Sequence, residues 1–167
     1  MAEEIINRVE QSGLVTLELD SLLSQYKWKM LDVKLLLHEE YVLKEKDFRL
    51  FVKGHSWEQY RGMVLGVYCS NDAIIPMWAY MLISSAATPY ASHIIFGNET
   101  KVKIKLINQA IRNLNTDKYW NERVIIKGCS SIHLPEQTYI NITKKLQPVV
   151  KSLMFGEACS TVPIYKK

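Results

Sequence analysis

From residue 62 onward, the chain alternates between short apolar runs typical of strands and longer segments typical of helices. Met63–Tyr68, Ile94–Phe96 and Arg123–Lys127 are predicted strands. Pro76–Ala87 and a segment that begins at Asn98 are predicted helices, the first apolar on nearly all sides and therefore expected to be covered. Strands that alternate with helices of this length favour a parallel sheet with right-handed crossovers. The pattern predicts an α/β fold of three layers, with a mainly parallel sheet flanked by helices.

The first 61 residues resemble a mixed α+β lead-in to this alternating core. Leu14–Leu19 and Trp28–Val33 are predicted strands, helical pieces are expected within Leu35–Phe51, and Trp57–Tyr60 is expected to form one more turn. No linker rich in proline, glycine or serine divides the chain. We therefore expect a single domain over residues 1–167, with the lead-in at 1–61 and the alternating core at 62–167.

The segment after the third predicted strand is too long for one helix. A continuous helix from Glu136 to Phe155 would span roughly 30 Å, whereas a strand of five or six residues spans about 17–20 Å. Pro148 is expected to break it, so that Glu136–Gln147 is helical and Val149–Phe155 turns back toward the other end of the sheet. Val162–Tyr165 is a predicted edge strand, because Pro163 cannot donate a ladder hydrogen bond.

Each of the three cysteines is followed by a serine: Cys69-Ser70, Cys129-Ser130 and Cys159-Ser160. The first pair directly follows a predicted strand, the second follows one after Gly128, and both precede predicted helices. Ligands of open parallel sheets bind beyond the carboxyl ends of the strands, and a helix N-terminus favours a thiolate. The serine hydroxyls are expected to cap a helix or to hydrogen-bond a thiolate or a bound anion. With the break at Pro148, Cys159 returns to the same end of the sheet.

If the three sulfur atoms converge, the residue types indicate a metal site. Three thiolates with one nitrogen, oxygen or water suit zinc, iron or an iron–sulfur cluster. Asp72, His133 and Glu157 are candidates for the fourth ligand or for groups that hydrogen-bond the ligands. The cysteine spacings of 60 and 30 residues (129 − 69 and 159 − 129) match no compact zinc-finger or ferredoxin pattern.

Two other functions are compatible with the same turns. One is a thiol enzyme, either a persulfide carrier or an oxidoreductase that uses one reactive cysteine. The other is a binding module whose turns present backbone N–H groups to a phosphate or carboxylate while the cysteines are structural. The sequence contains no glycine-rich phosphate loop, HExxH motif or GxSxG motif.

Composition narrows the class of protein further. No run of 18 apolar residues is present, and the chain starts Met-Ala-Glu-Glu, without the basic region of a signal peptide. We expect a cytoplasmic protein whose three thiols stay reduced. The net charge of +4 comes without a recognisable basic module, so neither nucleic acid nor membrane is an expected partner, and the oligomeric state is open.

Several segments carry a family resemblance: INRVEQSGLVTLEL, KEKDFRLFVK, CSNDAIIPMWAYMLI, VIIKGCS and KSLMFGEACSTVPIYKK. Together they resemble the bacterial family known as domain of unknown function 2480, over nearly the whole chain. The three Cys–Ser motifs are the most specific part of the resemblance. It implies no assigned activity, but it favours a role in iron–sulfur cluster or sulfur handling, with iron–sulfur assembly proteins as partners.

Overall fold

The computed structural model describes residues 13–128, 131–157 and 160–167, and the chain divides into two compact units. The central unit is Gln25–Lys105. The terminal unit combines the chain up to Ser24 with Leu106–Lys167. That the whole chain is a single domain stays a prediction.

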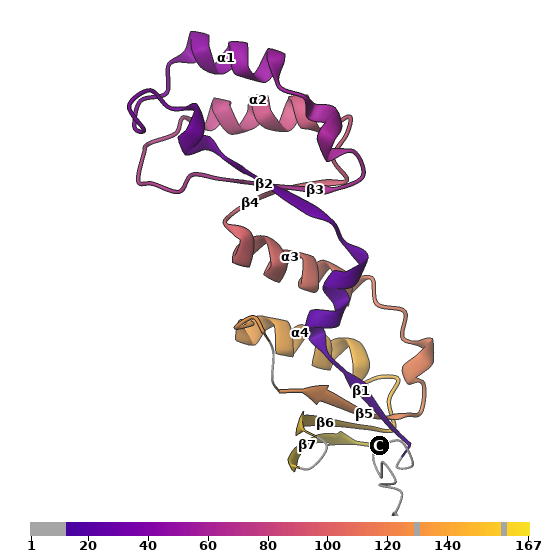
Figure 1. Ribbon diagram of the computed structural model, residues 1–167. Helices are drawn as coiled ribbons and strands as arrows, with labels where there is room; N and C mark the ends of the chain where they lie inside the picture. Colours follow the sequence, from indigo (N-terminus) through magenta and orange to yellow (C-terminus); the bar gives the residue numbers. More distant parts are fainter. Residues whose placement is uncertain (1–12, 129–130, 158–159) are drawn as a thin grey trace, which may run out of the picture. The chain divides into compact units, whose positions relative to one another are not determined.

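The central unit is built on a three-stranded parallel sheet. β3 (Val64–Tyr68) pairs in parallel with β2 (Trp28–Asp32) on one side and with β4 (His93–Phe96) on the other. α1 (Glu45–Gly54) and α2 (Met77–Ala87) lie on one face of this sheet (Figure 1). The unit also contains two 3-10 helices and the start of a further helix: η3 (Val33–Leu36), η4 (Trp57–Tyr60) and α3 (Glu99–Arg112).

The core of the central unit fills both faces of its sheet. Between the sheet and the two helices, the buried Phe48 of α1 meets Trp78 of α2 edge to face, with ring centroids 5.7 Å apart. On the other face, a Cβ on Gly66 of β3 would collide with the buried Val102 of α3. Four of the five β3 residues are therefore buried, as is typical of a central parallel strand.

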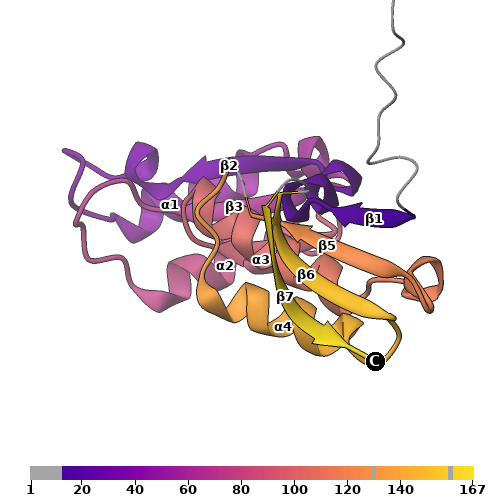
Figure 2. The same ribbon diagram turned by 90° about the horizontal axis from the view of Figure 1, so that it is seen from below.

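The terminal unit is built on a four-stranded sheet in the order β1-β5-β6-β7 (Figure 2). β1 (Leu14–Leu17), β5 (Arg123–Lys127) and β6 (Ser152–Glu157) run parallel, and β7 (Ser160–Lys166) returns antiparallel at the edge. α4 (Glu136–Leu146) buries three residues of one face. Two 3-10 helices complete the unit: η2 (Leu19–Gln25) follows β1, and η5 (Asp117–Tyr119) precedes β5.

The two units share one strand–helix–strand element, which we call the repeat: β3–α2–β4 in the central unit and β5–α4–β6 in the terminal unit. In each copy the two strands are parallel neighbours. Pro76 and Pro135 before the helices are 59 positions apart (135 − 76), and so are Gly97 and Gly156 (156 − 97) after the second strands. At this spacing the three buried positions of α2 correspond to the three of α4. Identical residues at this spacing are Pro76 and Pro135, Tyr80 and Tyr139, Ile83 and Ile142, Pro89 and Pro148, Phe96 and Phe155, Gly97 and Gly156.

The predicted α/β fold with mainly parallel strands is confirmed, but the strands form two sheets and not one. β1 pairs with β5, whereas β2 pairs with β3. Hydrophobic periodicity identifies a strand, whereas the partner of that strand depends on contacts between distant segments of the chain. The expected single sheet is therefore corrected to one sheet in each unit.

The predicted break at Pro148 is confirmed. α4 ends at Leu146, and the chain returns as β6, parallel to β5. Pro163 lies in the edge strand β7, opposite Met154, next to a register shift. A proline is tolerated there because an edge strand has one side without ladder bonds.

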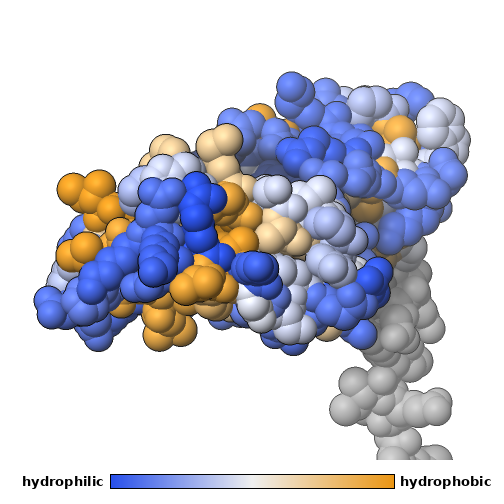
Figure 3. All heavy atoms as spheres, turned by 90° about the horizontal axis from the view of Figure 1, so that it is seen from above, coloured by the Kyte–Doolittle hydropathy of each residue, from blue (hydrophilic) through white to orange (hydrophobic). Residues whose placement is uncertain are grey.

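The expectation that α2 is largely covered holds only in part. Ala79, Ile83 and Ala87 face the core, but Met77 and Met81 are 71% and 69% exposed. A helix on a three-stranded sheet buries only the face that it turns to the sheet. Figure 3 shows apolar side chains among polar ones on the side of the central unit that carries α1 and α2.

Gly156→Ala is expected to lower the free energy of unfolding by about 1–3 kcal/mol. Gly156 has a φ of +124°, and a Cβ there would collide with the carbonyl oxygen of Ser160. Urea denaturation measures the effect. The matched control is Gly54→Ala in α1, where nothing lies within 4 Å of the added Cβ, so stability stays constant or rises by up to about 1 kcal/mol. Equal losses in the two variants would contradict this prediction.

Candidate functional site

The first Cys–Ser pair begins the loop that follows β3. Cys69 is half-buried, and its Sγ donates to Oδ1 of Asn71 at 2.9 Å. The same Oδ1 accepts the N–H of Ala73 at 3.2 Å, and the Asn71 amide donates to the carbonyl of Glu40. The Asn71 side chain thus connects the thiol to two loops. The hydrogen bond from sulfur fits a protonated thiol, because a thiolate cannot donate.

Ser70 is held by a carboxylate from the neighbouring strand. Its N–H donates to Oδ1 of Asp32, the last residue of β2, at 3.0 Å, and Lys34 N–H donates to the same oxygen at 3.0 Å. Burial by itself raises the pKa of Asp32, but hydrogen bonds from Ser70 and Lys34 and the positive charge of Lys34 outweigh it, so the pKa is lowered. The predicted helix cap by Ser70 is wrong, because α2 starts at Met77 without a side-chain cap.

The Asp32 carboxylate counts against the alternative in which this turn binds a phosphate or carboxylate ligand. A phosphate held by the Ser70 N–H would have to displace Asp32 from that donor, and the two negative charges would repel each other. In the central unit the turn therefore already holds an anion of its own.

A tyrosine hydroxyl lies near the thiol. Burial raises the pKa of Tyr80, and the negative charge that Cys69 would carry as a thiolate raises it further. The Tyr80 ring packs edge to face on Phe96 of β4, with centroids 5.2 Å apart. The loop after β3 and the helix α2 therefore place a thiol within electrostatic range of a phenol at the carboxyl end of the sheet.

The terminal unit repeats this arrangement with different residues. Cys129 and Ser130 lie outside the described residues, but the next residue, Ser131, donates from its N–H and its hydroxyl to Oδ2 of Asp20, at 2.7 and 2.6 Å. Tyr139 is the counterpart of Tyr80, and burial followed by the charge of Asp20 raises its pKa. Tyr139 packs edge to face on Phe155, the counterpart of Phe96, at 5.6 Å.

The third Cys–Ser pair stands between β6 and β7. Cys159 lies outside the described residues, while Ser160 is exposed and begins β7, paired with Glu157 at the end of β6. Oε1 of Glu157 is buried and has no hydrogen-bond partner within residues 13–128, 131–157 and 160–167. A buried carboxylate oxygen without a donor is costly, which makes Glu157 the most informative of the predicted accessory residues.

The other two predicted accessory residues, Asp72 and His133, are exposed. Neither belongs to a group of potential metal ligands among the described residues. Within residues 13–128, 131–157 and 160–167, no three His, Cys, Asp or Glu side chains are grouped so that they could hold a metal. The predicted ligands Cys129 and Cys159 and the hydroxyl of Ser130 lie outside those residues.

Sequence reasoning missed the repeat and with it the paired residues around each turn. The signal was present, because Tyr80 and Tyr139 recur at the same 59-residue spacing as Phe96 and Phe155. Asp20 and Asp32 carried no such signal, since they precede their turns by very different lengths of chain. Their role follows only from the pairing of β1 with β5 and of β2 with β3.

Together these features define an α/β protein with a repeated Cys–Ser turn at the end of a central parallel strand. In the part of the chain that the structure describes, no helix has the length and apolar character of a membrane span. The chain belongs to the family described as Protein of unknown function (DUF2480), whose model matches residues 3–167. Neither a curated protein nor a solved structure matches it significantly.

Asp32→Asn is expected to lower the free energy of unfolding by about 1 kcal/mol near neutral pH. Because the folded-state pKa lies below the ordinary value of 3.8, the stabilisation is present above that pH and is lost as pH falls through the folded-state pKa. Urea denaturation between pH 2 and 7 checks it. Asp72→Asn, which removes an exposed carboxylate from the same loop, is the control. A difference from wild type that persists at the lowest pH would contradict the assignment.

Proposed function

We propose that this protein binds a transition metal, zinc or iron, or an iron–sulfur cluster through cysteine thiolates at the carboxyl end of the terminal sheet. Cys129 and Cys159 are the ligands at the centre of the proposal. Its role is accessory, in cluster assembly or sulfur handling, and not turnover of a small substrate.

The register of the terminal sheet is the observation that carries the proposal. Lys127 of β5 stands opposite Gly156 of β6 in a parallel pair. Cys129 follows Lys127 by two residues, and Cys159 follows Gly156 by three. Neighbouring strands are about 4.8 Å apart, and two sulfur ligands of one tetrahedral ion with bonds of about 2.3 Å lie roughly 3.8 Å apart. Cys129 and Cys159 thus follow, in the sequence, two strands whose carboxyl ends are neighbours.

Glu157 supports the same location. It follows Gly156 directly, and its buried Oε1 lacks a donor. A cation would satisfy that oxygen, since carboxylates ligate zinc and iron. Two thiolates and one carboxylate would leave a tetrahedral ion with one further position, for water or for a third thiolate.

The repeat supplies an internal comparison for these residues. Glu157 of the terminal unit corresponds to Asn98 of the central unit (157 − 59 = 98), whose side chain accepts from Lys101 N–H at 3.0 Å and begins α3. In one copy this position is a neutral helix cap, and in the other it is a half-buried carboxylate whose Oε1 is buried without a hydrogen-bond partner among the described residues. This difference supports a metal site in the terminal copy, while Cys69 hydrogen-bonds Asn71 in the central copy.

Anaerobic purification followed by metal analysis and an ultraviolet–visible spectrum tests the proposal. Wild-type protein is expected to contain zinc, iron or a cluster. Cys129→Ser and Cys159→Ser are each expected to lower bound metal at least about tenfold, since even the partners of ligands change affinity by 10–100-fold. Glu157→Gln keeps the side-chain shape and is expected to weaken binding less than loss of a thiolate.

Cys69→Ser is the comparison variant in the central unit. It removes the same atom from the loop after β3, and its metal content measures directly whether Cys69 contributes a third thiolate. Metal-free wild-type protein, or metal content unchanged in both Cys129→Ser and Cys159→Ser, would overturn the proposal.

A further inference from the structure

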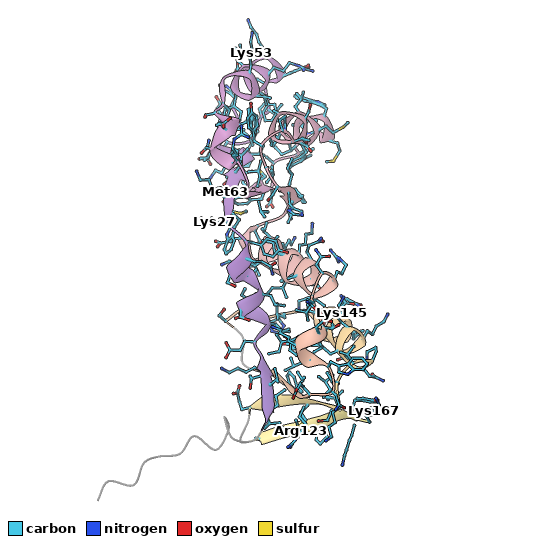
Figure 4. The ribbon with its side chains drawn as sticks, turned by 90° about the vertical axis from the view of Figure 1, so that its right-hand side faces the viewer. Lys27, Lys53, Met63, Arg123, Lys145 and Lys167 are labelled. Carbon is cyan, nitrogen blue, oxygen red and sulfur yellow. The ribbon has the colours of Figure 1, made fainter. Side chains whose placement is uncertain are left out.

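A basic groove lies at the end of the terminal sheet where β5 and β6 begin. It has a volume of about 420 Å³ and is lined mainly by Arg123, Lys151, Met154, Tyr165, Lys166 and Lys167. Figure 4 shows Arg123 and Lys167 at this end of the sheet. The proposed metal site lies beyond the opposite, carboxyl ends of the same strands, so the two are separate features of the terminal unit.

Backbone hydrogen bonds fix the cationic residues in place. Lys151 N–H donates to the carbonyl of Glu122 at 2.8 Å, and Lys167 N–H donates to the carbonyl of Lys151 at 3.0 Å. Lys166 pairs in register with Ser152, which in turn pairs with Arg123. Three adjacent strands therefore hold four positive charges around one concavity. Because these residues are already ordered, binding a ligand there costs less conformational entropy than binding it with a mobile tail would.

The three lysines of the groove carry positive charge that no described residue neutralises. Lys151, Lys166 and Lys167 form no ion pair with any described residue, and none of the described residues that line the groove is an aspartate or a glutamate. Lys34 and Lys103, in contrast, are paired with glutamates. Like charges held together in a concave site repel one another and attract an anion.

The groove also has an apolar part. Tyr165 is half-buried and stands opposite Leu153 in the ladder, and Met154 is half-buried beside it. An aromatic ring beside cations can stack on a flat ligand group while the cations bind charged oxygens. The volume falls in the range of small-molecule sites, roughly 300–1,000 Å³.

We propose that this groove binds an organic diphosphate of the nucleotide class. Its phosphates are bound by Lys151, Lys166 and Lys167 together with Arg123, and its flat group packs on Tyr165. This inference is independent of metal binding.

The test is an NMR titration of the full-length, isotope-labelled protein with ADP, inorganic pyrophosphate and adenosine. ADP is expected to cause saturable shifts at residues 151, 166 and 167. Pyrophosphate is expected to bind the same residues more weakly, and adenosine is not expected to reach saturation.

Lys151→Ala with Lys166→Ala is expected to weaken ADP binding about tenfold or more, because both charge-assisted hydrogen bonds are lost. Tyr165→Ala is expected to weaken ADP binding more than pyrophosphate binding.

The matched control is Lys144→Ala with Lys145→Ala. These residues line another basic pocket of the terminal unit, with Arg112, so the double variant removes the same charge from a different place. ADP affinity is expected to change less than about twofold, because neither lysine lines the groove and salt screens exposed charges that do not contact the ligand. Equal weakening in both double variants, or no saturable ADP shift in the folded wild-type protein, would overturn the proposal.

Discussion

The contact between an aspartate and a serine turn is the constraint on which both units depend. In each sheet a Cys–Ser pair follows a central strand in the sequence. An aspartate at the end of the neighbouring strand, or shortly after it, accepts a hydrogen bond from the N–H of a serine in that segment. Asp32 accepts from Ser70, and Asp20 accepts from Ser131. Each contact closes a long chain segment, from residue 32 to 70 or from 20 to 131. It thereby fixes where the cysteine-bearing loop leaves the sheet, and a charge-assisted hydrogen bond is strong enough to keep it there.

The repeat explains why the two turns look alike and why they need not act alike. Both copies keep the proline before the helix, the Tyr–Phe edge-to-face pair and the positive-φ glycine, which are requirements of packing and of the chain path. The copies differ at buried positions as well, since Ala79 and Ala87 of α2 correspond to Thr138 and Leu146 of α4. They also differ at the position after the glycine: Asn98 caps α3 in one copy, whereas Oε1 of Glu157 is buried without a hydrogen-bond partner among the described residues in the other. The second difference leaves a polar atom without a donor, which is why the metal proposal centres on the terminal unit.

Much of the local structure could be predicted from residue patterns. The strand over residues 64–68, the helix after Pro76 and the break before Pro148 all follow from periodicity and from the missing N–H of proline. The exposed side of α2 could not be predicted, because apolar composition does not say how much of the surface of a helix a small sheet can bury. The candidate site was predicted only in its cysteines. The carboxylates that hold the turns lie far away in sequence, and the basic groove joins residue 123 to residues 151 and 166.

By itself the sequence determined most of the elements, their order and the three Cys–Ser pairs, because these depend on neighbouring residues and on the conformational limits of proline and glycine. Only the tertiary structure decided that the segment after Pro148 forms the strand β6. It also decided that β1 and β2, which are consecutive, join different sheets, and that Asp32 and Asp20 hydrogen-bond Ser70 and Ser131. Strand pairing is decided by contacts over tens of residues, where burial of apolar surface selects among partners that local patterns cannot distinguish. For the same reason, the basic groove exists only in the folded sheet.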